Sequence, residues 1–473
     1  MSDFAAIQTA LSGLLAHRQA LETIGHNVAN AATDGYSRRR VDFTAAAGGT
    51  VPALFAKPRL SGNGVDIAGT TRIRDQLLEA RVRSELAAKS RLDAQVEVYD
   101  RIEMALPEPS DTGLSVQLGD FWAAWHDIAN QPKVMASRSA LLEQANTLAG
   151  ALNRAATQIA NARNDLLATS EALIADANAL AVRIADLNEA IRGAVAAGLQ
   201  PDDLMDQRDA LVEDLTALVG GTARESEHGM VDVFVGGSAY VRGDRAAALE
   251  LRDGPDFTTP NVGQPFLKVE VAWKGADGTV PLTDGQVGGL LEGINEVFPR
   301  YVQALDEVAS TLVTTVNDLH RSGYALDGTT TNLDFFDPTG TTARTIALDA
   351  GMRDHPELIA ASSVAIPGGT LDGGLAEKIA ALSSSASGAD ARYRALIGQL
   401  GVEAQATQRR ADMQASVYIQ VAEAAVSVRG VSLDEELANL VVSQQAYAAS
   451  ARVLTAIDEM LDTLISRTGH VGR

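Results

Sequence analysis

The sequence contains no cysteine among its 473 residues, and this absence removes several kinds of chemistry at once. Without thiols the chain has no disulfide scaffold, no cysteine nucleophile and no zinc site with sulfur ligands. Aromatic residues are also sparse, at 4% of the sequence. The chain is still long enough to bury substantial cores in several domains without covalent or metal cross-links.

Positive charge is scarce as well. Lys and Arg number 39 against 61 Asp and Glu, which gives a formal net charge of −22. Nucleic acids are bound by clustered Lys and Arg, and the largest basic cluster here is the run from Arg38 to Arg40. We therefore expect no nucleic-acid partner, and we interpret this run as a solvated or interface patch.

Long apolar runs are missing too. No stretch approaches the roughly 18 apolar residues of a membrane helix, so we expect no membrane insertion. The amino terminus, MSDFAAIQTALSGLLAHR, does not resemble a secretory signal, because its first charge is Asp3 and not a basic region. A secreted protein with this terminus needs a route that does not cleave a leader.

Motifs for catalysis, cofactors and metals are absent from the sequence: HExxH, GxSxG, the P-loop and GxGxxG do not occur. Asp202, Asp203, Asp206 and Asp209 are numerous enough to suggest calcium, but they lack the glycine and terminal Glu of an EF-hand loop, so a solvated helix start is favoured. The run Asp434 to Glu436 is likewise interpreted as the acidic first turn of a helix and not as a glycosidase pair. We expect no enzyme, no catalytic residue, no cofactor and no metal site.

Apolar residues near the amino terminus recur at alternating spacings of three and four, which predicts a helix with a narrow coiled-coil stripe. The helix is expected to end at Asn30, before the Asp-Gly turn signal in AATDGYS. We call this set the N-terminal stripe: Phe4, Ile7, Leu11, Leu14, Leu21 and Val28.

The carboxyl end repeats this design. Ser432 with Glu435 three residues later is a capping-box signature, which predicts a helix start. The C-terminal stripe consists of Leu433, Leu437, Leu440, Tyr447, Leu454, Leu461 and Ile465, with Gln444 and Asp458 as polar members. The two stripes are most simply buried against each other, which would pair the termini and loop out everything between them.

Between the ends, long helices are predicted from about Arg72 to Leu106, from Leu114 to Ile128, from Ser137 to Ala197, and after Pro201. The third of these carries an apolar residue every seven positions: Ala145, Leu152, Ile159, Leu166, Leu173, Leu180, Leu187 and Ala194. Such a repeat favours a long helix in a bundle or a coiled coil.

Two insertions interrupt the helices. Residues 220–289 alternate apolar and polar positions (Val231, Val233, Val235, then Leu249 and Leu251, then Leu267 to Trp273), which predicts a small β domain. Helix returns from Leu290, and residues 323–374 form a second irregular insertion with a strand-like piece at 345–348.

The expected fold is therefore mainly α, a long-helix bundle and coiled coil with paired termini and these two insertions. The predicted domains are a terminal coiled coil (1–36 and 430–465), a helix bundle (37–219 and 290–429), the β domain (220–289) and a tail (466–473).

The stretch NVANAATDGYSRRRVDF resembles the amino-terminal motif of flagellar axial proteins, and its TDGYSR core is most similar to the hook-associated protein 1 family. SVRGVSLDEELANLVVSQQAYAASARVLTAIDEMLDTLI is similar to the carboxyl-terminal segment of that family. Three interior segments are similar to signatures of the same family and follow one another in the same order: LSVQLGDFWAAWHDIANQP, MDQRDALVEDLTALVG and RYRALIGQLGVEAQAT. The residues of the amino-terminal motif are Asn27, Asn30, Thr33, Gly35, Tyr36, Ser37 and Arg38.

The resemblance implies a structural component of the bacterial flagellum that joins the hook to the filament and is needed for filament assembly. It implies export through the type III flagellar export apparatus without cleavage, with an export chaperone bound at the C-terminal stripe. The exported protein is then expected outside the cell, in a ring of its own copies that contacts hook protein and hook-associated protein 3. Both stripes become assembly interfaces that line the inner channel, and the β domain faces outward.

Two alternatives stay open at this stage. The first is another axial protein, such as a hook or rod subunit, although the interior signatures favour the junction protein. The second is a secreted adhesin whose β domain binds a ligand.

Terminal helices of about 30 residues with interrupted stripes are only marginally stable alone. We therefore expect both ends of the chain to be disordered in the monomer and to order on assembly.

Overall fold

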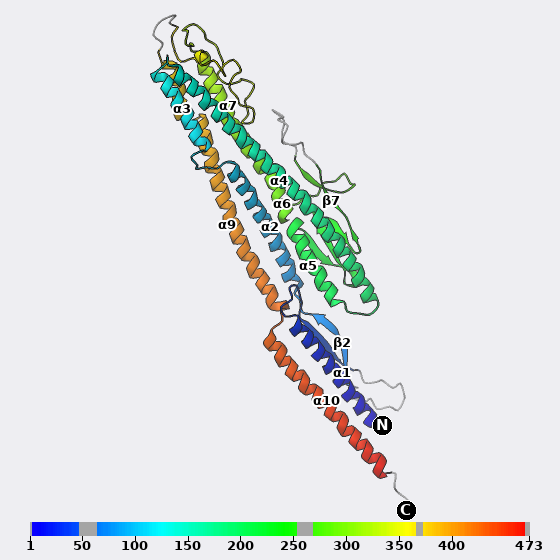
Figure 1. The fold of residues 1–473 in the computed structure, drawn as a ribbon. Helices are drawn as coiled ribbons and strands as arrows, with labels where there is room; N and C mark the ends of the chain where they lie inside the picture. The colour runs from blue at the N-terminus through cyan, green and yellow to red at the C-terminus, as the bar shows by residue number, and fades with distance from the viewer. Residues whose placement is uncertain (1, 47–63, 253–267, 366–371, 469–473) are drawn as a thin grey trace, which may run out of the picture.

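Two helices from opposite ends of the chain lie side by side at one end of the molecule (Figure 1). They are α1 (Ser2–Ala29) and α10 (Leu433–Thr468). The computed structural model describes residues 2–46, 64–252, 268–365 and 372–468, with no side-chain description for residues 2–5, 464, 465, 467 and 468. The expected pairing of the termini in a mainly α fold is confirmed.

The other helices form a long bundle that extends away from this pair (Figure 1). They are α2 (Gln76–Ala105), α3 (Leu114–Asn130), α4 (Met135–Ala196), α5 (Asp202–Val219), α6 (Gly285–Glu292), α7 (Phe298–Arg321), α8 (Gly374–Ala380) and α9 (Ala389–Arg429). The start expected at Arg72 is wrong, because Asp75 caps α2 by accepting hydrogen bonds from the backbone N–H groups of Leu77 and Leu78. The start expected at Leu290 is also wrong, because α6 begins at Gly285.

The strands pair only with antiparallel neighbours within the described residues. β1 (Arg39–Ala45) and β2 (Val65–Arg72) form a hairpin beside α1. β3 (Thr222–Glu225), β4 (Val231–Val235), β5 (Ser238–Arg242) and β6 (Arg245–Ala246) form a meander, and β7 (Leu249–Arg252) pairs with β8 (Glu270–Trp273). Leu267 lies outside the described residues. The strand expected at 345–348 does not form, since Leu348 makes a single bridge with Phe336.

Two asparagine side chains of α4 form hydrogen bonds with backbone groups of these strands. Asn178 of α4 accepts a hydrogen bond from the N–H of Leu249 (2.7 Å) and donates one to its carbonyl (2.9 Å). Asn188, also on α4, makes the same pair of bonds with Val231, at 3.1 and 2.8 Å. Each amide thus acts as a short strand partner, which satisfies buried backbone groups and fixes the sheets against α4.

The end of the bundle opposite the termini has an aromatic core. Phe121 and Trp125 of α3 pack against Phe335 and Phe336 of the second insertion. His320 of α7 is fully buried beside them; its Nδ1 lies 2.7 Å from the carbonyl of Leu333, and its Nε2 accepts the N–H of Ala360 at 2.9 Å. Burial lowers the pKa of His320 to about 4, so the ring is neutral and carries its proton on Nδ1.

The seven-residue repeat of α4 is buried along only half of the helix. Ala145, Leu152, Ile159 and Leu166 are fully buried, whereas Leu173, Leu180 and Leu187 are half-exposed. In this second half the buried apolar positions are instead Ile174, Ala177, Ala181, Ile184, Ala185 and Ile191. In a straight α-helix, residues seven positions apart differ by about 20° in their direction around the helix axis. The direction of the repeat therefore changes along α4, and the later leucines point out of the core.

We expect the stability of the protein to fall as pH drops from about 6.5 towards 4 because of His320. In that range the unfolded chain binds a proton at this histidine and the folded chain does not, so protonation favours unfolding. The difference in unfolding free energy between the wild type and His320→Gln should change by about 2 to 3 kcal/mol between roughly pH 7 and pH 4.5, measured by urea unfolding. A constant difference over that range contradicts the assignment of a neutral buried ring.

Candidate assembly interface

The N-terminal stripe is not the face that α1 buries. Leu11 is 45% exposed and Val28 is 38% exposed, while Ile7, Leu14 and Leu21 are half-buried. Phe4 lies outside the described side chains. The buried positions of α1 are Ala10, Ala16, Ala20, Thr23, Ile24 and Asn27. The expectation that the two apolar stripes bury each other is therefore wrong for Leu11 and Val28, and Ile7, Leu14 and Leu21 are buried only in part.

The C-terminal stripe is half correct. Leu440, Tyr447, Leu454 and Leu461 are half-buried, but Leu433 and Leu437 are 50% and 56% exposed, and Ile465 lies outside the described side chains. The fully buried residues of α10 are Glu436, Ser443 and Ile457 among the described side chains. Each lies one residue before a position of the C-terminal stripe or of its polar members.

Small residues explain why the face that each terminal helix buries differs from its stripe of large apolar residues. A Cβ on Gly13 of α1 would lie 3.1 Å from the Oγ of Ser450 on α10, so the two helices approach closely at this point. Ala10, Ala16 and Ala20 continue the same small-residue face. Close packing of small side chains leaves the larger leucines of both helices directed elsewhere.

Asn27 is the centre of the amino-terminal motif, and all its hydrogen-bonding capacity is used. Its Oδ1 accepts from the hydroxyl of Tyr36 (2.7 Å) and from the N–H of Arg39 (3.0 Å). Its Nδ2 donates to the carbonyl of Arg39 (2.9 Å) and to Oε2 of Glu436 (3.1 Å). The side chain is 1% exposed, and it joins α1, β1 and α10 at a single point.

The other motif residues build the turn that brings Tyr36 back to Asn27. Asn30 donates to the carbonyl of His26 (3.0 Å), and the N–H of Thr33 donates to the carbonyl of Asn30 (2.9 Å). Gly35 has a φ of 78°, a conformation that favours glycine. Burial raises the pKa of Tyr36 to about 12, which keeps its hydroxyl protonated as the donor to Asn27.

Arg38 connects the motif to the carboxyl-terminal helix. Its Nε donates to Oε1 of Glu436 (2.7 Å), its Nη1 donates to Oε2 of Glu435 (2.6 Å), and its backbone N–H donates to the carbonyl of Arg429 (2.9 Å). Glu436 is only 2% exposed. The interpretation of the acidic run 434–436 as the first turn of a helix is confirmed, and Glu436 is in addition a buried partner of Arg38 and Asn27.

A second set of ion pairs connects the hairpin to α5. Arg72 donates to Asp206 and Asp209 at 2.9 Å each. Arg39 pairs with Asp203 and lies 3.5 Å from Asp206. The complete set also contains Arg74 with Asp209 and Glu79, Arg208 with Asp209, and Arg39 with Asp202.

The four aspartates therefore do not form a solvated helix start, although Asp203 itself is 67% exposed. Burial raises the pKa of Asp202 and opposes its ionisation, and the nearby Arg39 and Arg72 favour its charged form. We call this set, together with Asn27, Tyr36, Arg38 and Glu436, the joint. It connects the terminal helix pair, the hairpin and the bundle.

The joint accounts for Ser37 as well. Its backbone N–H lies 3.4 Å from Oδ2 of Asp206, and the residue is 2% exposed. Arg40, in contrast, is 68% exposed and contacts Asp42 of its own strand. The basic run thus contributes two residues to an internal interface and one to the surface, in agreement with its interpretation as a solvated or interface patch.

The outward faces of the terminal pair carry large apolar side chains. Leu11 and Leu15 of α1 are 45% and 43% exposed, and α10 exposes Val441, Val442, Val453 and Met460 by 50% or more. Exposed apolar side chains on neighbouring helices are typical of surfaces that another protein covers.

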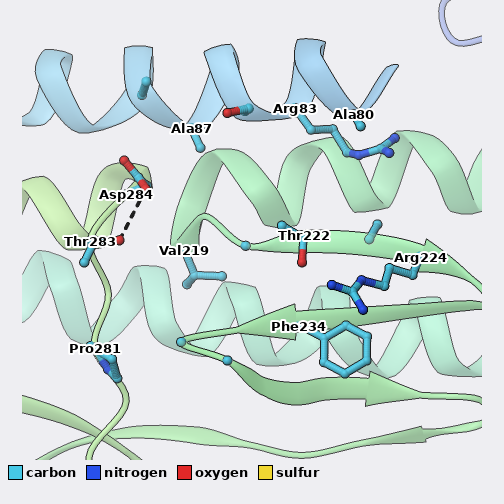
Figure 2. A pocket seen from close by; sticks show the side chains of 16 residues that line it. Ala80, Arg83, Ala87, Val219, Thr222, Arg224, Phe234, Pro281, Thr283 and Asp284 are labelled. Atoms are coloured by element: carbon cyan, nitrogen blue, oxygen red, sulfur yellow. Dashed lines mark hydrogen bonds between the residues drawn. The ribbon is translucent and has the colours of Figure 1, made fainter. Parts of the chain in front are cut away.

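Figure 2 shows a pocket of about 580 Å³ between α2, the β3–β4 meander and the segment before α6. Arg83 projects from α2 and Arg224 from β3, with the guanidinium of Arg224 5.6 Å from the ring centre of Phe234. Burial lowers the pKa of Arg83. Asp284 provides the single carboxylate among the lining residues, and it accepts a hydrogen bond from Thr283. This pocket would offer two cations to an anionic group.

Among the described residues, no helix is long and apolar enough to cross a membrane. The same residues contain no group of three or more His, Asp or Glu side chains placed to hold a metal ion.

Comparisons with known proteins place flagellar families along the chain. Residues 99–336 match the model of the flagellar hook-associated protein FlgK helical domain. Residues 7–36 match the flagella basal body rod protein model, and residues 422–467 match the carboxyl-terminal model of the flagellar basal body rod FlgEFG proteins.

Similar proteins include flagellar hook-associated protein 1 of Bacillus subtilis, 29% identical over 519 aligned positions that cover all of both chains. The protein of the same name from Salmonella typhimurium is 28% identical over 68% of this chain and 57% of its own length. Among solved structures, the flagellar hook junction protein FlgK from Burkholderia pseudomallei gives a TM-score of 0.47 at 23% identity, over 55% of this chain and 46% of that one.

We expect Arg38→Ala to destabilise the protein by about 2 to 4 kcal/mol, because it leaves the buried carboxylate of Glu436 without its guanidinium partner. Arg40→Ala is the matched control from the same basic run. Its exposed pair with Asp42 should contribute less than about 1 kcal/mol. Urea unfolding followed by circular dichroism measures both, and equal effects of the two substitutions contradict the role given to Arg38.

Proposed function

The chain belongs to the flagellar hook-associated protein FlgK family, and on this premise we propose that it joins the flagellar hook to the filament and is needed for filament assembly. The observation that carries the proposal is the order of the matches along the chain. The FlgK helical-domain model covers residues 99–336, and models of axial rod proteins cover both ends. The protein is thus a structural component of the flagellum.

The proposed partners follow from this position. Copies of the chain form a ring that contacts hook protein on one side and hook-associated protein 3 on the other. Before assembly the chain passes through the type III flagellar export apparatus, and an export chaperone binds the C-terminal stripe. The final location is the hook–filament junction of the extracellular flagellum.

The terminal pair supports this function physically. The expected assembly stripes contribute Leu11, Val28, Leu433 and Leu437 to the exposed surface of the monomer, where a neighbouring subunit can cover them. Burial of apolar surface between copies is worth about 25 cal/mol per Å², so a repeated stripe favours a closed assembly over the free monomer. In the assembled state the terminal helices line the inner channel, and the β3–β8 region faces outward.

The alternatives have less support. A rod or hook subunit would account for the matches at both ends, but not for the FlgK model over the middle of the chain. A ligand-binding adhesin would have to use a site such as the pocket of Figure 2, and the relatives with matching sequences are named as flagellar hook-associated proteins.

Deleting the gene is expected to leave cells with complete hooks that carry no filaments, because the filament then has no junction on which to begin. Electron microscopy of the deleted strain measures this, together with an assay of unassembled flagellin in the medium, which should increase. Restoring the intact gene is the control. Normal filaments in the deleted strain contradict the proposed junction role.

A further inference from the structure

A groove between α4 and α5 exposes leucines that the bundle does not bury. Two adjoining cavities of about 460 and 630 Å³ share Arg183, and their lining includes Leu180 and Leu218 in one and Leu187 and Leu211 in the other. The larger cavity is also lined by the turn of residues 33–36 and by Asp203 and Asp206 of the joint, which close one end of the groove. Leu180 and Leu187 are the members of the seven-residue repeat that rotate out of the core. We call this feature the α4–α5 groove.

The rim of the groove is acidic. Asp176 and Asp186 of α4 and Asp214 of α5 line it and are exposed. Within the part of the chain that the structure describes, these three carboxylates form no ion pair, unlike the aspartates of the joint. The groove thus combines a half-exposed apolar floor with several carboxylates and one guanidinium, that of Arg183. Its net negative charge favours a partner that presents apolar side chains and cations.

One surface of this molecule has that composition. On α9, Val402, Met413, Val417 and Val428 are exposed by 67%, 62%, 37% and 39%. At 100° per residue these four positions fall within an arc of about 80°, and Arg409 and Arg410 lie in or beside the same arc. We call these six residues the α9 stripe.

Among the residues that the structure describes, the two arginines of the α9 stripe have no carboxylate partner. Arg409 donates to Gln405, and Arg410 donates to Thr407. Over the described ranges, neither guanidinium lies within 4.0 Å of a carboxylate. Both charges are exposed and available to a partner.

The stripe and the groove lie on different edges of the same molecule. α2 packs against both α9 and α5, and α5 packs against α4, so α2 and α5 separate α9 from α4 in this part of the bundle (Figure 1). A chain therefore cannot fill its own groove with its own α9. Two different surfaces that complement each other generate a head-to-tail contact, which closes into a ring or continues as a helix.

We propose that the α9 stripe of one copy docks in the α4–α5 groove of the next copy, with Arg409 and Arg410 against the acidic rim. This inference rests on the proposed assembly into a ring, and it names the surfaces that hold the ring together. The stripe from Val402 to Val428 spans about 39 Å along α9, and the groove from Asp176 to Leu187 spans about 16 Å along α4, so the groove covers part of the stripe at a time. The contact joins neighbouring bundles and is separate from the stripes of the terminal helices.

Cysteine cross-linking tests the contact directly, because the natural chain contains no cysteine. Met413→Cys is combined with Ala179→Cys or with Ala210→Cys, two exposed positions in the lining of the groove. Full-length variants are expressed in the deleted strain, and isolated hook–filament structures are treated with a short thiol-specific cross-linker. At least one double variant should give multimers of the chain, and each single variant should remain monomeric.

A double variant that supports filaments but stays monomeric overturns the proposed contact and leaves the junction role intact. A single groove variant that is labelled at its cysteine with a photoreactive reagent and then captures hook protein, and not another copy, also overturns it, because the groove then holds a different partner. Loss of the junction role itself would show separately, as normal filaments in the deleted strain.

Charge reversal provides an independent measurement. Arg409→Glu with Arg410→Glu should reduce the number of filaments per cell about tenfold by placing acid against acid. Adding Asp186→Arg and Asp214→Arg to the same chain should restore filaments, because every copy then carries the reversed pair. Lys378→Glu, an exposed change on α8, is the control and should have no effect. Normal filaments in the first variant, or no recovery in the second, overturn the proposal.

Discussion

The contact between Glu436 and the pair Arg38 and Asn27 determines how the two ends of the chain meet. It buries a carboxylate near one end of α10 and gives it a guanidinium and an amide from a motif more than 390 residues earlier. A charge buried in this way is tolerated only when its partners are held in place, so one rotation of α10 about its axis is selected. That rotation places Ser443, Ser450 and Ile457 towards α1 and turns Leu437 and Val441 outward.

The exposure of the apolar stripes follows from the rotation of α10 that the Glu436 contact selects. If apolar burial alone decided the pairing, the leucines of α1 and α10 would face each other and the terminal pair would be complete by itself. Instead the pair is held by small residues and by the joint, and its larger apolar side chains remain available. A similar division occurs in the bundle, where the repeat of α4 rotates out of the core and leaves Leu180 and Leu187 at a groove. In both places the fold leaves apolar surface uncovered, as expected for a protein that completes its packing by assembly.

The sequence predicts the helices well because their periodicity extends over many turns, and it predicts the paired termini because both ends carry a stripe. It does not predict which face of each stripe is buried. A stripe defined by apolar size misses Ala10, Ala16 and Ser443, which are buried because they are small, and Glu436, which is buried because it has partners. The sequence alone predicts solvated aspartates from 202 to 209, because most of their arginine partners, at 39, 72 and 74, lie more than 100 residues away in the sequence. A carboxylate one position from an apolar seam, as at Glu436, is a signal that could have revealed the buried pair.

The most direct test of the central claim is hydrogen exchange of the dilute monomer. The terminal pair has few buried apolar residues, is held mainly by the joint, and exposes the faces that neighbouring subunits cover. Amides of α1 and α10 should therefore exchange much faster than those in the buried half of α4 and in α7. They should become protected once the protein is part of the flagellum. Protection of residues 5–25 in the monomer equal to that of α4 would contradict the claim, because the terminal pair would then be complete without assembly.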